Sequence, residues 1–103
     1  HLIGYDQEPG SLPPIVRHGH RYLLQRSNGF TIAGASVEHR GFDRSLDSTI
    51  VEKLHNTASR YLPGLLASPP SKAWTGLRPG VDAAEPQVRR IEGTDVWLAY
   101  GHY

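Results

Sequence analysis

The sequence predicts an α+β domain built on a mainly antiparallel sheet, with one principal helix packed on one face. Short runs of aliphatic, aromatic and β-branched residues recur along the chain, and connections rich in proline, glycine, asparagine and serine separate them, which is typical of strands. One longer segment instead repeats its apolar residues at helical spacing. Because the chain has 103 residues, it fits a single small domain.

The first third of the chain contains the clearest strand signals. Residues 1–5 are short and apolar, and the three prolines within residues 6–14 predict a surface connection after them. The runs 21–25 and 30–35 flank Asn28-Gly29, whose residue types suit a tight turn with positive φ. We therefore predict a β-hairpin here, with a strand before it.

The predicted helix begins after Asp47, which is a good N-cap, and runs to about Arg60. Its apolar stripe consists of Ile50, Val51, Leu54, Ala58 and Tyr61. A helix of this length is marginal in water by itself, so the stripe is expected to pack on the sheet. Before the helix, we expect residues 36–39 to prolong the second hairpin strand, and after it Pro63-Gly64 ends the helix.

Two further strands are predicted in the last third, at residues 72–77 and 95–100. Residues 79–94 between them are rich in turn residues and charges, and we interpret them as a loop. Trp74 and Trp97 occupy strand positions, where aromatic side chains are more often part of the core than of a ligand cleft.

Composition excludes several classes of function. Eleven Lys and Arg are balanced by ten Asp and Glu, and Arg89-Arg90 is too short to form a nucleic-acid patch. No apolar run approaches the roughly 20 residues of a membrane span. The absence of cysteine excludes disulfides and thiolate chemistry and permits the cytoplasmic location that we expect. Because the chain starts at His1 and has no methionine, we expect a longer parent polypeptide.

Four segments carry residue patterns that belong together. They are residues 22–26 (YLLQR) with the turn 27–29 (SNG), residues 34–38 (GASVE) leading to 41–43 (GFD), residues 74–80 (WTGLRPG) and residues 101–103 (GHY). In this order they resemble the FAD-dependent oxidoreductases of the D-amino-acid oxidase class, most closely its glycine-oxidase-like and D-amino-acid-dehydrogenase-like branches. The resemblance implies oxidation of the C–N bond of an amine or amino acid by hydride transfer to FAD.

The resemblance also implies that residues 1–103 are one part of a two-domain flavoprotein. Such proteins combine a dinucleotide-binding domain with a substrate domain whose antiparallel sheet covers the flavin ring. No GxGxxG follows a strand here, so we expect the Rossmann-type FAD-binding domain to be absent from the chain. The chain is then a C-terminal, substrate-domain fragment that is inactive alone, and its exposed sheet face and edge strands should favour self-association.

One segment departs from the family pattern. After its GLRPG the family usually continues with Asp-Gly-x-Pro and an Ile-Gly pair, whereas residues 83–90 (AAEPQVRR) keep only the proline. A second hypothesis therefore stays open, in which the chain is a non-catalytic binding or interaction domain that retains the fold without flavin.

By resemblance, Arg78 binds the carboxylate of an amino-acid substrate, because a guanidinium satisfies both oxygens at once. Tyr22 matches a position that supplies a hydroxyl to the same carboxylate. The alternatives are that Arg78 forms a surface ion pair and that Tyr22 is a half-buried strand residue with one hydrogen bond. Gly101 and His102 match a loop that brings backbone close to the flavin, and we interpret them as vestigial cofactor contacts.

Two other groups of polar residues are weaker candidates. On a strand, His18 and His20 would place both imidazoles on one face and suggest a metal. No third ligand stands at a recognisable spacing, so we interpret them as adventitious metal binders or as solvated side chains. Glu38 and Asp43 are interpreted as turn and surface groups, because nothing in the sequence fixes them across a cleft.

Overall fold

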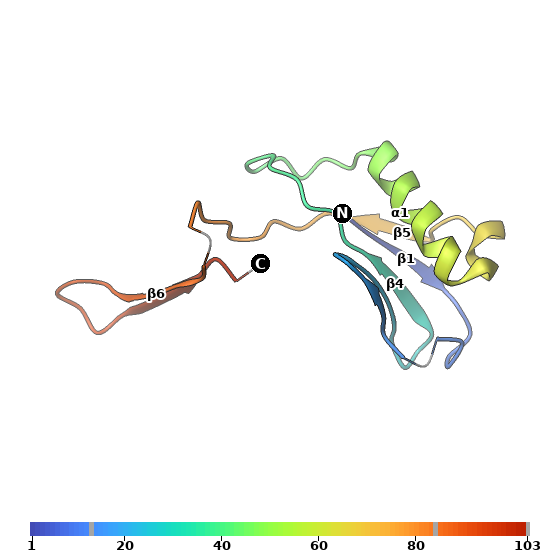
Figure 1. Ribbon diagram of the computed structural model, residues 1–103, viewed down its shortest axis with the longest axis horizontal. Coiled ribbons are helices and arrows are strands. Elements are labelled where there is room, and N and C mark those ends of the chain that lie inside the picture. Colours follow the sequence, from blue (N-terminus) through green and yellow to red (C-terminus); the bar gives the residue numbers. More distant parts are fainter. Residues whose placement is uncertain (13, 84, 103) are drawn as a thin grey trace.

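The computed structural model describes residues 1–12, 14–83 and 85–102, and Figure 1 shows how its elements are arranged. Pro13 of the first connection, Ala84 of the divergent segment and Tyr103 of the last motif lie outside the described residues. The elements are β1 (Leu2–Asp6), β2 (Val16–His18), β3 (Arg21–Gln25), β4 (Phe30–Gly34), α1 (Ser48–Tyr61), η1 (Pro63–Ala67), β5 (Lys72–Trp74), β6 (Gln87–Arg90) and β7 (Trp97–Tyr100).

The main sheet confirms the predicted α+β class. Its strand order is β2-β3-β4-β1-β5, every neighbouring pair is antiparallel, and α1 covers one face. The predicted hairpin forms β3 and β4 through a turn closed by a hydrogen bond from the Gly29 N–H to the Arg26 carbonyl at 2.9 Å. Gly29 has φ of +88°, and a Cβ there would stand 2.0 Å from the Gln7 carbonyl oxygen, so only glycine fits.

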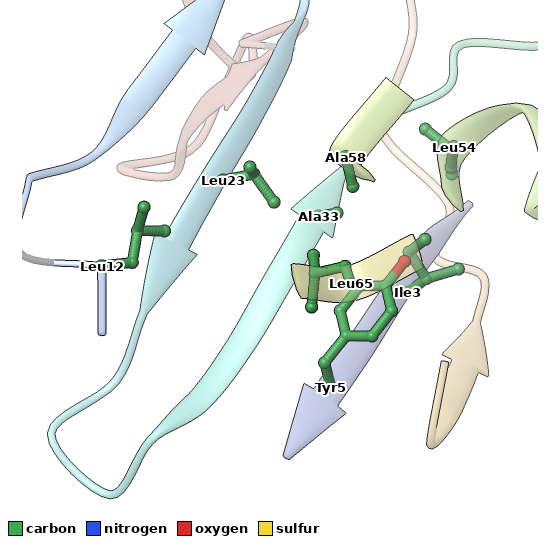
Figure 2. Close-up of a cluster of buried hydrophobic side chains, with 8 residues drawn as sticks. All are labelled: Ile3, Tyr5, Leu12, Leu23, Ala33, Leu54, Ala58 and Leu65. Carbon is green, nitrogen blue, oxygen red and sulfur yellow. The ribbon is translucent and has the colours of Figure 1, made fainter. Parts of the chain in front are cut away.

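The register of the strands separates two faces of this sheet. Leu23 on β3 and Ile3 on β1 both pair with Ala33 on β4, and these side chains point toward α1. Figure 2 shows the core that they build with the helix, and its members are Ile3, Tyr5, Leu12, Leu23, Ala33, Leu54, Ala58 and Leu65. Because strand side chains alternate, Tyr22 lies on the opposite face of the sheet, which α1 leaves open.

Helix α1 has the predicted start and the predicted buried stripe. The Asp47 carboxylate accepts hydrogen bonds from the backbone N–H groups of Thr49 at 2.9 Å and Ile50 at 3.3 Å, which satisfies two otherwise unpaired donors. Leu54 and Ala58 are buried. The chain then continues into the 3₁₀ helix η1, a turn that the Pro63-Gly64 stop signal did not predict.

Several predicted strand bounds were wrong. Residues 36–39 form no strand. The Ser36 N–H still donates to the His1 carbonyl at 3.3 Å, but beyond it the Glu38 side chain contacts the buried His1 ring. Strand β5 ends at Trp74 and does not reach residue 77. Strands β2 and β6 were missed, because they are three and four residues long, mostly exposed, and lack a clear apolar alternation.

The strand at residues 97–100 does not join the main sheet. Strands β6 and β7 form a separate two-stranded sheet that projects from the body of the molecule (Figure 1). The radius of gyration is 17.0 Å, whereas a compact chain of this length has about 13 Å. Trp97 is therefore 66% exposed, and its assignment to the core was wrong. Trp74 is only half-buried and stacks on Phe30, with ring centroids 6.4 Å apart.

Candidate functional site

The two predicted substrate-binding residues meet at one hollow on the open face of the sheet. This Tyr22–Arg78 hollow has a volume of about 450 Å³. Its lining residues are Ile15, Arg17, His20, Tyr22, Leu24, Ala35, Val37 and Arg78. Tyr22 and Leu24 come from alternate positions of β3, whereas Arg78 comes from the segment that follows β5. The fold therefore joins residues from opposite halves of the chain.

Tyr22 is positioned by the glycine opposite it. Tyr22 pairs with Gly34 of β4, and a Cβ on Gly34 would lie 3.1 Å from the Tyr22 hydroxyl oxygen and 2.3 Å from Leu2 Cδ2. The missing side chain thus leaves space for the phenol ring to lie over β4. Within residues 1–12, 14–83 and 85–102, no group is hydrogen-bonded to the Tyr22 hydroxyl, so this hydroxyl is available to a ligand.

Arg78 is exposed and lies between two hollows. It lines the Tyr22–Arg78 hollow and also a second, more polar hollow of about 310 Å³, which His1, Glu38 and Val81 line as well. The alternative was that Arg78 forms a surface ion pair. In the described part of the chain Arg78 has no ion-pair partner, and the arginine ion pairs there are formed by Arg40 and Arg90. The Arg78 guanidinium faces solvent and the two hollows.

His1 anchors the loop that carries Val37 to the site. Its imidazole is almost fully buried; Nε2 accepts the Asp47 backbone N–H at 3.0 Å, and Nδ1 lies 3.1 Å from a Glu38 carboxylate oxygen. Because Nε2 accepts, Nδ1 carries the proton and donates to Glu38. Sequence reasoning missed this role, since a histidine has no local signal for partners so distant in sequence.

The carboxylates near this loop are structural. Hydrogen bonding from the Ser45 backbone N–H, helped by the nearby Arg40 charge, lowers the pKa of Asp43. The Ile50 and Thr49 backbone N–H groups, together with Arg40, lower the pKa of Asp47. The interpretation of Asp43 as a turn residue is confirmed by its hydrogen bond from the Ser45 backbone N–H at 2.8 Å. Glu38 is more than a surface group, because it fixes the His1 ring.

The two histidines of the HxH motif lie on different faces. His18 ends β2 and contacts the Tyr61 ring of α1 with centroids 6.3 Å apart, whereas His20 lies in the turn between β2 and β3 and lines the Tyr22–Arg78 hollow. Both side chains are exposed, and because the strand ends between them, they do not share one strand face. In the described ranges, no three His, Cys, Asp or Glu residues gather as a metal site.

Gly101 and His102 do not line the Tyr22–Arg78 hollow. Gly101 is buried with φ of +81°, and a Cβ there would stand 2.7 Å from Val81 Cγ2, so it packs behind the second hollow. His102 is exposed. The approach of the backbone to a flavin at these residues stays a prediction.

The open sheet face suits one part of FAD. Its apolar side chains are Leu2, Leu24, Phe30, Ile32 and Trp74, which alternate with the residues facing α1. Ile32 is buried and the other four are half-buried, so only part of this apolar surface is available to a flat ring system. The phosphates need different chemistry, usually a glycine-rich turn before a helix, and the sequence contains no GxGxxG. None of the helices that the structure describes combines the length and hydropathy that a bilayer crossing requires.

Comparisons with known proteins identify a family and several relatives. The family model described as FAD dependent oxidoreductase matches residues 3–103. Glycine oxidase of Pseudomonas aeruginosa is 37% identical over 103 residues, which are 99% of this chain and 28% of that protein. Glycine oxidase of Bacillus subtilis is 28% identical over 93 residues, covering 89% of this chain and 25% of its own length.

A third relative carries a different name. Hydrogen cyanide synthase subunit HcnC of Pseudomonas protegens is 31% identical over 83 residues, which are 80% of this chain and 20% of that protein. The chain thus spans between a fifth and somewhat over a quarter of the curated relatives that it matches. No solved structure gives a significant match.

Proposed function

The chain belongs to the FAD-dependent oxidoreductase family, and from this membership we propose that it is the substrate-facing part of a flavoprotein that oxidises an amine or amino acid. In this proposal residues 1–103 form a single C-terminal substrate domain, and the FAD-binding Rossmann-type domain lies elsewhere in a longer, cytoplasmic polypeptide. The 103 residues alone are inactive. The observation that carries the proposal is the meeting of Tyr22 and Arg78 at one hollow.

The lining residues suit an amino-acid carboxylate. The Arg78 guanidinium donates two parallel hydrogen bonds to its oxygens, and the Tyr22 hydroxyl donates a further one. Leu24 and Val37 flank these groups with apolar surface that displaces water from the bound substrate. Holding the carboxylate at one end fixes the position of the α-carbon, which is the main demand on the protein in this reaction.

FAD, when bound, supplies the acceptor for the hydride that leaves the α-carbon. The open face around Leu24 and Trp74 would hold the ring system from one side, and Gly101 with His102 would contact it beyond the second hollow. No acid–base dyad is assigned to this chain, since flavin chemistry does not require one.

The experiment is amino-acid-dependent bleaching of the purified full-length flavoprotein, followed near its flavin band at about 450 nm. Loss of a charged hydrogen-bond donor costs about 1.5–3 kcal/mol, so we expect Arg78→Ala to raise the substrate concentration for half-maximal bleaching by about 10- to 100-fold. Arg26→Ala, which removes an exposed arginine outside the hollow, is the matched control and should leave it unchanged.

Two outcomes would contradict the proposal. Bleaching that is equally sensitive to amino acid in wild type and Arg78→Ala would remove Arg78 from substrate binding. A colourless full-length protein would favour the second candidate, a non-catalytic binding domain. The divergence of residues 83–90 from the family pattern is the observation that keeps this second candidate open.

A further inference from the structure

The Tyr22–Arg78 hollow carries more positive charge than one carboxylate needs. Arg17 and His20 line it together with Arg78. No aspartate or glutamate is among its lining residues. An amino acid with a single carboxylate would satisfy Arg78 and leave the second arginine without an anion.

Arg17 is oriented by its strand pairing and by one hydrogen bond. It pairs with Tyr22 across β2 and β3, so both side chains leave the sheet on the same face. Its Nε donates to the Gly19 carbonyl at 3.2 Å, which fixes the guanidinium beside the turn. Its two terminal nitrogens have no partner in the described part of the chain, and they present a fork that matches a carboxylate.

Apolar side chains line the same hollow as the two arginines. Ile15, Leu24 and Val37 line the hollow, and Ile15 and Val37 are 71% and 57% exposed. Short aliphatic stems gain free energy by covering such surface. The lining therefore combines two arginines with apolar side chains.

We propose that the substrate of this site is a dicarboxylic amino acid, with Arg78 and Tyr22 on the α-carboxylate and Arg17 on the side-chain carboxylate. The inference rests on the proposed function and deepens it by naming the substrate class. Its structural basis is the placement of Arg17 and Arg78 around one hollow that has apolar walls and no acidic residue.

Equilibrium binding tests this without turnover. In isothermal titration of the full-length flavoprotein, glutarate should bind at least about tenfold more tightly than butyrate, since a second charged hydrogen-bonded contact is worth 1.4 kcal/mol or more. Arg17→Gln should abolish this advantage, so that glutarate and butyrate bind this variant within about twofold of each other. Arg26→Gln, the matched control, should retain the advantage.

The outcomes separate the two proposals. Equal affinity for glutarate and butyrate in wild type, or a glutarate advantage that survives Arg17→Gln, overturns the dicarboxylate inference even if amino acids bleach the flavin. An Arg17-dependent glutarate advantage in a protein that no amine bleaches supports the dicarboxylate site and refutes the oxidation reaction instead.

Discussion

At the residue scale, Tyr5 joins the sheet to the helix through one buried hydroxyl. Its ring is 1% exposed, and the hydroxyl is hydrogen-bonded to His55 Nδ1 on α1 at 2.9 Å. Burial raises the pKa of Tyr5 to about 12, because the low-polarity surroundings disfavour the phenolate. The protonated phenol is therefore part of the stability of the fold.

This predicts a specific loss of stability in alkali. The pKa of Tyr5 is higher in the folded chain than in the unfolded chain, where it is near 10. Tyr5 therefore stabilises the fold fully below pH 10 and loses this contribution as pH rises toward 12. Thermal unfolding from pH 8 to 12 should show that wild type loses stability above pH 10 more steeply than Tyr5→Phe. At neutral pH Tyr5→Phe should be less stable by about 0.5–1.5 kcal/mol.

Tyr22→Phe is the control for this measurement, because Tyr22 is half-buried and lies on the open face of the sheet. It should keep the wild-type slope above pH 10. Identical slopes in wild type and Tyr5→Phe would mean that the Tyr5 phenol does not couple ionisation to folding.

At the scale of elements, α1 contains one buried group that the fold does not satisfy. The Ser59 hydroxyl is buried and has no hydrogen-bond partner among the described residues. A buried hydroxyl without a partner costs free energy, and alanine is also the better helix former. We expect Ser59→Ala to raise the free energy of unfolding by up to about 1 kcal/mol, measured by urea denaturation.

Thr57→Ala is the matched control on the same helix. The Thr57 hydroxyl donates to the Lys53 carbonyl at 2.9 Å and accepts from Arg21 on β3, so its removal should destabilise the chain. A Ser59→Ala variant that is destabilised as much as Thr57→Ala would show that the Ser59 hydroxyl is in fact hydrogen-bonded.

The elements that the sequence predicts well are those with local causes. The Asp47 cap, the stripe that includes Leu54, and the Asn28-Gly29 turn each act within a few residues, and each appears where the pattern placed it. Strands β2 and β6 follow from pairing with a neighbouring strand, and no such pairing is visible in three or four exposed residues.

The candidate site also has parts with a local sequence signal and parts that depend on contacts between distant residues. Residue types and the WTGLRPG motif singled out Arg78 and Tyr22, but their meeting at one hollow depends on the path of the chain after β5. The roles of His1 and Arg17 had no local signal, since one depends on a loop contact and the other on the register of β2 with β3. Trp97 was misplaced because its sequence resembles a core strand while its sheet has only two strands.

At the scale of the whole molecule, the β6–β7 hairpin exposes several of its apolar side chains to solvent. Val88 and Trp97 lie on one face of this two-stranded sheet and are 65% and 66% exposed, while Ile91 and Val96 are exposed nearby. A two-stranded sheet is marginal in water unless its apolar residues pack on something else. In a solution of this chain alone, the available partner is another copy.

We therefore expect the 103-residue chain to self-associate, with a sedimentation coefficient that rises with concentration. Trp97→Lys should shift the population toward monomer, because it replaces the largest exposed apolar side chain of the hairpin with a charge. Ser27→Lys adds the same charge at the turn between β3 and β4, and it should leave association unchanged. A concentration-independent monomer in wild type would refute the prediction. Equal dissociation by both variants would instead indicate that net charge, and not the hairpin surface, controls association.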